Sequence, residues 1–149
     1  MEVSNVLVRD AQPGDVEAIW NLTRELAVFE HLEDQFVATV DDFHKELFGE
    51  DPAAKVIIAE IDGKLAGTAL YFRTFSTFLG RSGIWLEDLF IHEEYRRHGV
   101  ATKLMEELKR RSPGRLEWMV LDWNEDAIAL YDHLGATQFT DAWTHYRIT

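Results

Sequence analysis

Cysteine is absent from all 149 residues of the sequence. The chain can therefore form neither a disulfide framework nor a thiolate zinc site, and it cannot use a cysteine nucleophile. No apolar run approaches the roughly 20 residues that a membrane-spanning helix requires, so we expect no membrane partner. The opening residues MEVSNVLVRD have neither the basic nor the apolar segment of a signal peptide. Together these absences predict a cytoplasmic protein.

Positive charge is also scarce, since 15 Lys and Arg face 27 Asp and Glu and the net charge is -12. Binding to a nucleic-acid backbone needs an extended basic face, so we expect no nucleic-acid partner. Residues 1–62 hold fifteen acidic and four basic residues, whereas residues 96–115 hold seven of the basic ones. The first segment favours a cationic ligand and the second an anionic one. The alternative is a solvated acidic surface with a chance basic cluster.

Apolar residues make up 46% of the chain and no linker or repeat interrupts it, so residues 1–149 are predicted to form one domain. Apolar periodicity and turn signals predict a mixed α/β fold in the order β-α-α-β-β-β-α-β-α-β. The predicted helices begin at Pro13, Thr39, Gly99 and Asn124, and the predicted strands are Val6–Arg9, Lys55–Ile61, Leu65–Thr74, Ile84–Ile91, Leu116–Leu121 and Trp143–Ile148.

Two local signals fix element boundaries in this prediction. Thr39 with Asp42 three residues later resembles a capping box, which predicts the start of the second helix. The tripeptide Asp62-Gly63-Lys64 joins two apolar runs and predicts a hairpin between them.

The strongest functional signal is a glycine-containing turn that leads from an apolar strand into an amphipathic helix. Here the sequence reads Arg96-x-x-Gly99-x-Ala101. The first amides of a helix are unpaired, and the helix dipole adds positive potential there. Small residues let a phosphate approach those amides, and Arg96, Arg97 and Lys103 add charge. The segment is neither a Walker loop nor a G-x-G-x-x-G fingerprint, yet it predicts a pyrophosphate site.

Three segments together resemble a known family. They are WLEDLFIHEEYRRHGVATKLMEEL at residues 85–108, LDWNEDAIALYDHLGA at 121–136 and LAVFEHLEDQ at 26–35. In this order and spacing they resemble the N-acetyltransferases of the GNAT superfamily, in particular the spermidine/spermine and thialysine branch. The resemblance implies a GNAT-type mixed, mostly antiparallel central sheet flanked by helices. It also implies acetyl-CoA as co-substrate and a homodimer.

The resemblance implies a role for several residues toward acetyl-CoA. Backbone groups of Leu89, Phe90 and Ile91 would pair with the pantetheine arm, and Asn124 would contact it. Tyr131 would be the general acid. The implied pyrophosphate contacts are Arg96, Arg97, His98, Gly99, Val100, Ala101 and Thr102. Seven residues span nearly two helical turns, so Asn124 and Tyr131 share a face. The alternative for Tyr131 is an aromatic residue that packs in the core.

Acidic residues form the implied acceptor site. By the resemblance, Glu87 contacts the acceptor amine and accepts its proton, while Phe29, Glu30 and Asp141 contact the acceptor. Strand alternation predicts that Glu87 and Asp88, on a buried strand, point to opposite faces. The alternatives are structural salt bridges for the two strand carboxylates and a solvated helix end for Glu30. Phe29 stands where polyamine enzymes usually have tyrosine, which leaves the polyamine specificity open.

These inferences predict an acetyl-CoA-dependent N-acetyltransferase that acts on a primary amine of a small cationic acceptor. Polyamines, thialysine and lysine-like amines fit that description. The alternatives are a protein lysine or N-terminus as acceptor and a non-catalytic acyl-CoA-binding module with a regulatory role. The six histidines show no metal-ligand spacing, so we expect no metal.

Overall fold

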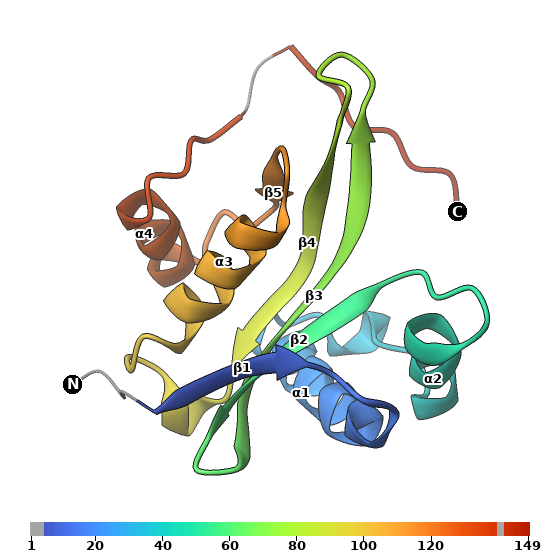
Figure 1. Ribbon diagram of the computed structural model, residues 1–149, viewed down its shortest axis with the longest axis vertical. Coiled ribbons are helices and arrows are strands. Elements are labelled where there is room, and N and C mark those ends of the chain that lie inside the picture. Colours follow the sequence, from blue (N-terminus) through green and yellow to red (C-terminus); the bar gives the residue numbers. More distant parts are fainter. Residues whose placement is uncertain (1–4, 140–141) are drawn as a thin grey trace. The chain divides into compact units, whose positions relative to one another are not determined.

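Five strands form one sheet in the part of the chain that the structure describes, in the order β1-β2-β3-β4-β5 (Figure 1). The computed structural model describes residues 5–139 and 142–149. The strands are β1 (Val6–Asp10), β2 (Lys55–Ile61), β3 (Lys64–Ser76), β4 (Arg81–Ile91) and β5 (Leu116–Trp118). The pairs from β1 to β4 are antiparallel, and β5 is parallel to β4. The predicted mixed, mostly antiparallel sheet is therefore confirmed.

Four helices accompany these strands in the described residues: α1 (Val16–Phe29), α2 (Val40–Phe48), α3 (Val100–Arg111) and α4 (Glu125–His133). None of them is long and apolar enough to span a membrane. The chain divides into two units, residues 1–119 with the sheet and α1 to α3, and residues 120–149 with α4.

The sheet of the first unit is covered on both faces, with α3 on one and α1 and α2 on the other (Figure 1). The near-continuous apolar run of β2 explains this arrangement, because successive side chains alternate between the faces. Val56 and Ile58 pack with Ile19 of α1 and Leu47 of α2, while Ile57 between them is fully buried toward the α3 face. The segment between β4 and α3 is thus attached to a buried scaffold.

The local signals in the sequence correspond to observed structure. The Thr39 hydroxyl accepts from the Asp42 amide at 3.1 Å, and the Asp42 carboxylate accepts from the Thr39 amide at 2.8 Å. Asp62 and Gly63 have φ of 52° and 76° in the β2–β3 turn. Gly135, with φ of 84°, follows α4 directly after Leu134. The capping box and the hairpin are therefore confirmed.

The predicted strand over Trp143–Ile148 is not formed: the described residues 142–149 contain neither helix nor strand. Alternation of side chains predicts a strand, but a strand also needs a neighbour whose backbone completes its hydrogen bonds. Here Trp143, Tyr146 and Ile148 are 92%, 87% and 100% exposed. Likewise, β5 ends at Trp118 instead of Leu121. The prediction of a final strand at Trp143–Ile148 is therefore wrong.

Candidate active site

The backbone edge of β4 is open over half of the strand. β5 pairs with β4 only from Ile84 to Leu86, because β5 itself ends at Trp118. From Glu87 to Ile91, no described strand pairs with β4 on that side. An unpaired strand edge presents a row of N–H and C=O groups to an extended ligand. This open edge contains Leu89, Phe90 and Ile91, the positions that the sequence assigned to a ligand's amide arm.

Consecutive backbone amides at the start of α3 have no hydrogen-bond acceptor within the helix. Gly99 precedes the helix with φ of 79°, a left-handed conformation that favours glycine, and no side chain caps the helix there. Lys103 is the first residue whose N–H bonds back along the helix, to the Gly99 carbonyl at 3.1 Å. The N–H groups of Val100, Ala101 and Thr102 precede it and have no acceptor within the helix. This is the geometry of an anion site at a helix N-terminus.

Arg96 and Arg97, the two arginines of the loop before α3, differ in their contacts and exposure. The Arg96 Nε donates to the Ile91 carbonyl at 3.0 Å, and its guanidinium lies 5.1 Å from the Phe29 ring and 5.0 Å from the Phe90 ring. Arg96 therefore ties the loop to α1 through cation–π contacts. Arg97 is exposed and has φ of 67°, which leaves it as the loop cation most open to a ligand. His98 is half-buried.

A β-bulge in β4 changes which face its carboxylates occupy. Asp88 pairs with Leu70, and the next pair is Leu86 with Tyr71, so Glu87 is an extra residue. Directly opposite residues share a face of the sheet. Asp88 therefore lies with Leu70 on the α1 face, and the extra residue Glu87 interrupts the alternation from which the opposite orientation of Glu87 and Asp88 is predicted. The alternation rule fails here because the extra residue breaks the period of two.

Three carboxylates gather where α1 ends beside β4. Burial, together with the nearby charges of Glu87 and Glu30, raises the pKa of Asp88 to about 6. Burial also raises the pKa of Glu30. Glu87 itself is exposed, contrary to the buried position predicted for it, and its Oε1 accepts from the Trp85 Nε1 at 3.1 Å. This part of the site is acidic, and one of its carboxyl groups titrates near neutral pH.

Sequence reasoning missed the contributions of Trp85 and Asp88. The spacing of Trp85 and Glu87, two residues apart on a strand, was a usable signal, because such side chains share a face. Nothing local marked Asp88, since its orientation depends on the register between β3 and β4. The sequence favoured a structural salt bridge for Asp88, yet no described cation pairs with it.

The second unit contains the other predicted residues. Asn124 caps α4, and its Oδ1 accepts from the Ala127 N–H at 3.3 Å. Tyr131 is half-buried in the last turn of the same helix. Asn124 thus has a structural role at the helix start through its Oδ1 atom. Its side-chain NH₂ group is a separate donor and can make a second contact. Asp141 lies outside the described residues.

Replacing Asp88 by asparagine should stabilise the protein at pH 7. Because the folded pKa, about 6, exceeds the ordinary value of 3.8, the folded state holds the proton more tightly than the unfolded state. The free energy of unfolding therefore falls as the pH rises from about 4 through 6, and the penalty is complete above about pH 7. Asp88→Asn removes a cost of about 3 kcal/mol. Urea unfolding at pH 4 to 8 measures it.

Glu106→Gln is the matched control, because Glu106 is an exposed carboxylate on α3. It removes the same net charge but should leave the free energy of unfolding within about 0.5 kcal/mol of wild type. Equal pH profiles for Asp88→Asn and wild type would contradict the raised pKa.

A match to a known family follows the same segments. A model described as the Acetyltransferase (GNAT) family matches residues 17–136. That stretch contains the open edge of β4, the free backbone amides at the start of α3, and helix α4. The chain belongs to this family of acetyltransferases.

Two relatives specify the class further, and one solved structure shows the same fold. The thialysine N-epsilon-acetyltransferase of Sus scrofa is 33% identical to the chain, over 97% of this chain and 93% of that protein. The L-ornithine N5-acetyltransferase of Arabidopsis thaliana is 30% identical, over 95% and 83%. An integron cassette protein from the mobile metagenome of V. cholerae has the same fold, with a TM-score of 0.80, 22% identity and coverage of 99% and 94%. The chain is accordingly an N-acetyltransferase.

Proposed function

We propose that this enzyme transfers acetyl from acetyl-CoA to a primary amine of a small cationic acceptor, such as a polyamine, thialysine or a lysine-like amine. One observation carries the proposal: Glu30, Glu87 and Asp88 meet beside an open strand edge and place unpaired negative charge there. An ammonium group is the natural counter-ion. The relatives named for thialysine and L-ornithine N-acetylation support this acceptor class.

The residues of the first unit fit acetyl-CoA as the acetyl donor. The amides of residues 100–102 are suited to a pyrophosphate, and Arg97 supplies charge beside them. The free edge of β4 from Leu89 to Ile91 is suited to the two amides of a pantetheine arm, which would add to the sheet as a strand does. Asn124 would contact the same arm.

In the proposed chemistry, one residue accepts a proton from the amine before attack and another donates a proton to the thiolate that leaves. An amine must lose a proton before its nitrogen can attack a thioester carbonyl, and Glu87 accepts that proton through a water molecule. Attack forms the C–N bond and an oxyanion, the nitrogen releases its second proton to water, and collapse of the oxyanion breaks the C–S bond. Tyr131 then protonates the leaving thiolate, a role that suits a phenol because it stays protonated near neutral pH.

The acceptor contacts follow from the end of α1. Phe29 is 38% exposed beside Glu30, so its ring can contact the methylene chain of an acceptor while the carboxylate binds a second ammonium. Phenylalanine provides no hydroxyl for this purpose, so selection among diamines depends on charge and length.

We also propose one domain and a homodimer. The family match from residue 17 to 136 spans both units, which supports a single domain over residues 1–149. Phe75, Phe78 and Leu79, at the connection of β3 and β4, are 68%, 100% and 50% exposed. Such an apolar cluster on a soluble enzyme supports association with a second copy.

Cationic acceptors should exceed neutral amines of equal length in kcat/KM, with a preference that shrinks as ionic strength rises, because screening weakens long-range attraction.

Glu87→Gln should lower kcat, since it removes the proposed proton acceptor. Glu30→Gln should chiefly raise KM for dicationic acceptors, because it removes only binding charge. A coenzyme A release assay over an amine panel at two salt concentrations measures all three.

Glu46→Gln on α2 is the control, because this carboxylate is exposed and distant in sequence from the acidic group. Its kinetics should match wild type. Equal turnover of neutral and cationic amines at low salt would refute the charge argument. Turnover of lysine peptides alone would instead make a protein lysine the acceptor.

A further inference from the structure

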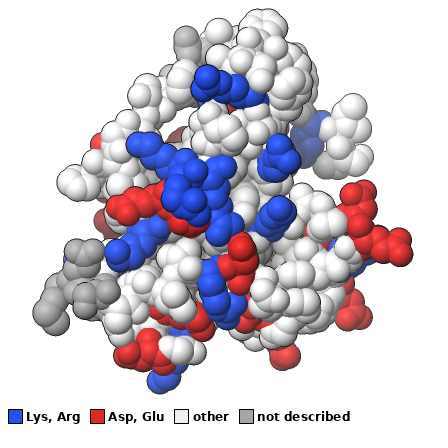
Figure 2. Space-filling model, viewed as in Figure 1, with Lys and Arg blue, Asp and Glu red and all other residues white. Residues whose placement is uncertain are grey.

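A second group of cations lies far from the loop before α3. Although the net charge is -12, Lys and Arg side chains gather in the middle of the face shown in Figure 2. A cavity of about 290 Å³ opens among some of them, within the first unit. It is lined by Lys55, Tyr71, Arg73, Ser82, Arg111 and Pro113, with Gly83 and Ile84. We call this the basic groove.

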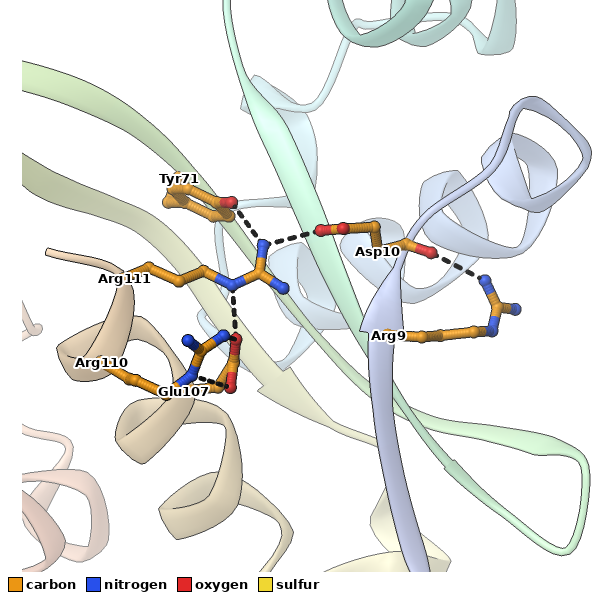
Figure 3. Close-up of polar contacts among 6 residues, drawn as sticks. All are labelled: Arg9, Asp10, Tyr71, Glu107, Arg110 and Arg111. Atoms are coloured by element: carbon orange, nitrogen blue, oxygen red, sulfur yellow. Dashed lines mark hydrogen bonds and ion pairs between the residues drawn. The ribbon is translucent and has the colours of Figure 1, made fainter.

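Arg111 forms a fixed wall of the basic groove. Its Nε donates to Glu107 at 2.6 Å, and its Nη1 donates to Asp10 at 2.7 Å and to the Tyr71 hydroxyl at 3.1 Å (Figure 3). No acceptor among the described residues faces its Nη2. A guanidinium held in place by three partners loses little further entropy when it binds an anion.

Tyr71 supplies a second, independent observation. This side chain is only 5% exposed, and its oxygen accepts from Arg111. The hydroxyl proton has no acceptor within residues 5–139 and 142–149, although the residue lines the cavity. Buried hydroxyl groups normally use their proton. An acceptor atom inside the groove would satisfy it.

Arg111 is paired with Asp10 and Glu107, whereas the other cations of this region are unused. Lys55 and Arg73 line the groove, and Arg81 and Arg115 line an adjacent cavity of about 100 Å³. None of these four side chains has an ion-pair partner in the described part of the chain. An anion bound among these side chains would neutralise their charge.

We propose that the basic groove binds a small anion with two or more phosphate groups, at a site separate from the loop before α3. Arginine forks and a lysine suit phosphate oxygens, and the Tyr71 and Ser82 hydroxyls can donate as well. Arg111 ends α3 whereas Gly99 precedes it, so the 12 residues of the helix separate the two sites by roughly 18 Å.

Inorganic pyrophosphate is the probe, and an NMR titration of the wild-type protein reports where it binds. We expect the amide signals of Ser82 and Gly83 and the side-chain Nε–H signals of Arg73 and Arg111 to shift. Shifts confined to residues 97–102 would overturn the proposal, because the anion would then occupy the loop alone. The absence of shifts at 10 mM pyrophosphate would overturn it as well, because a site with a Kd of about 1 mM would then be roughly nine-tenths occupied.

Variants test the same site by calorimetry. Arg73→Gln and Lys55→Gln should each weaken groove binding at least fivefold, while Lys109→Gln should stay within twofold, since Lys109 is an exposed cation of α3 outside the groove. Equal weakening by all three variants would indicate only general charge attraction and overturn the site. Citrate is the second ligand, and tighter binding of citrate than of pyrophosphate would overturn the phosphate class.

Discussion

Tyr131→Phe should lower kcat by roughly 10²-fold or more, the usual scale for loss of a general acid. The substitution keeps the ring and removes only the hydroxyl, so packing in the last turn of α4 should survive. The affinity for acetyl-CoA should be unchanged, because the hydroxyl is needed only when the thiolate leaves. Steady-state kinetics and calorimetry with a non-reactive acetyl-CoA analogue separate the two effects.

Tyr146→Phe is the matched control, because Tyr146 is in the same unit and 87% exposed. It should have wild-type kcat. If Tyr131→Phe also kept its kcat, Tyr131 would be a packing residue, which is the alternative that the sequence left open.

Gly99→Glu should weaken acetyl-CoA binding by at least about 10²-fold and abolish the rise in Tm that the cofactor causes, since a ligand that binds only the folded state stabilises it by mass action. Gly99 has φ of 79° directly before the amides of α3. A side chain there fills the space that a phosphate would occupy, and its carboxylate repels the phosphate charge. Thermal unfolding with and without acetyl-CoA measures the loss.

Gly63→Glu controls for backbone strain and charge together. Gly63 has φ of 76° in the β2–β3 turn, and a Cβ atom there would meet nothing within 4 Å. Both variants therefore carry a similar left-handed strain of about 1–2 kcal/mol and the same added charge. Only Gly63→Glu should keep the rise in Tm that acetyl-CoA causes. If Gly99→Glu folded and retained that shift, the loop would not be the pyrophosphate site.

The sequence by itself determined those features whose cause is local. The capping box at Thr39, the turn at Gly63 and the helix start after Gly99 each depend on backbone preferences within a few residues. The amphipathic patterns of α1 and α3 gave the layers, because apolar faces must be buried somewhere. The free amides before α3 belong to this group, since a helix start creates such amides wherever it occurs.

Only the tertiary structure decided the features that depend on pairing between distant segments. The bulge that turns Asp88 toward α1 comes from the register of β4 on β3, and the raised pKa of Asp88 follows from the burial which that register imposes. The open edge of β4 exists because β5 ends early, and the predicted strand at Trp143–Ile148 failed for want of a neighbour. The basic groove likewise combines Lys55, Arg73 and Arg111, which only the folded chain brings together. Local sequence encodes conformation, whereas register and proximity are set by the packing of the whole sheet.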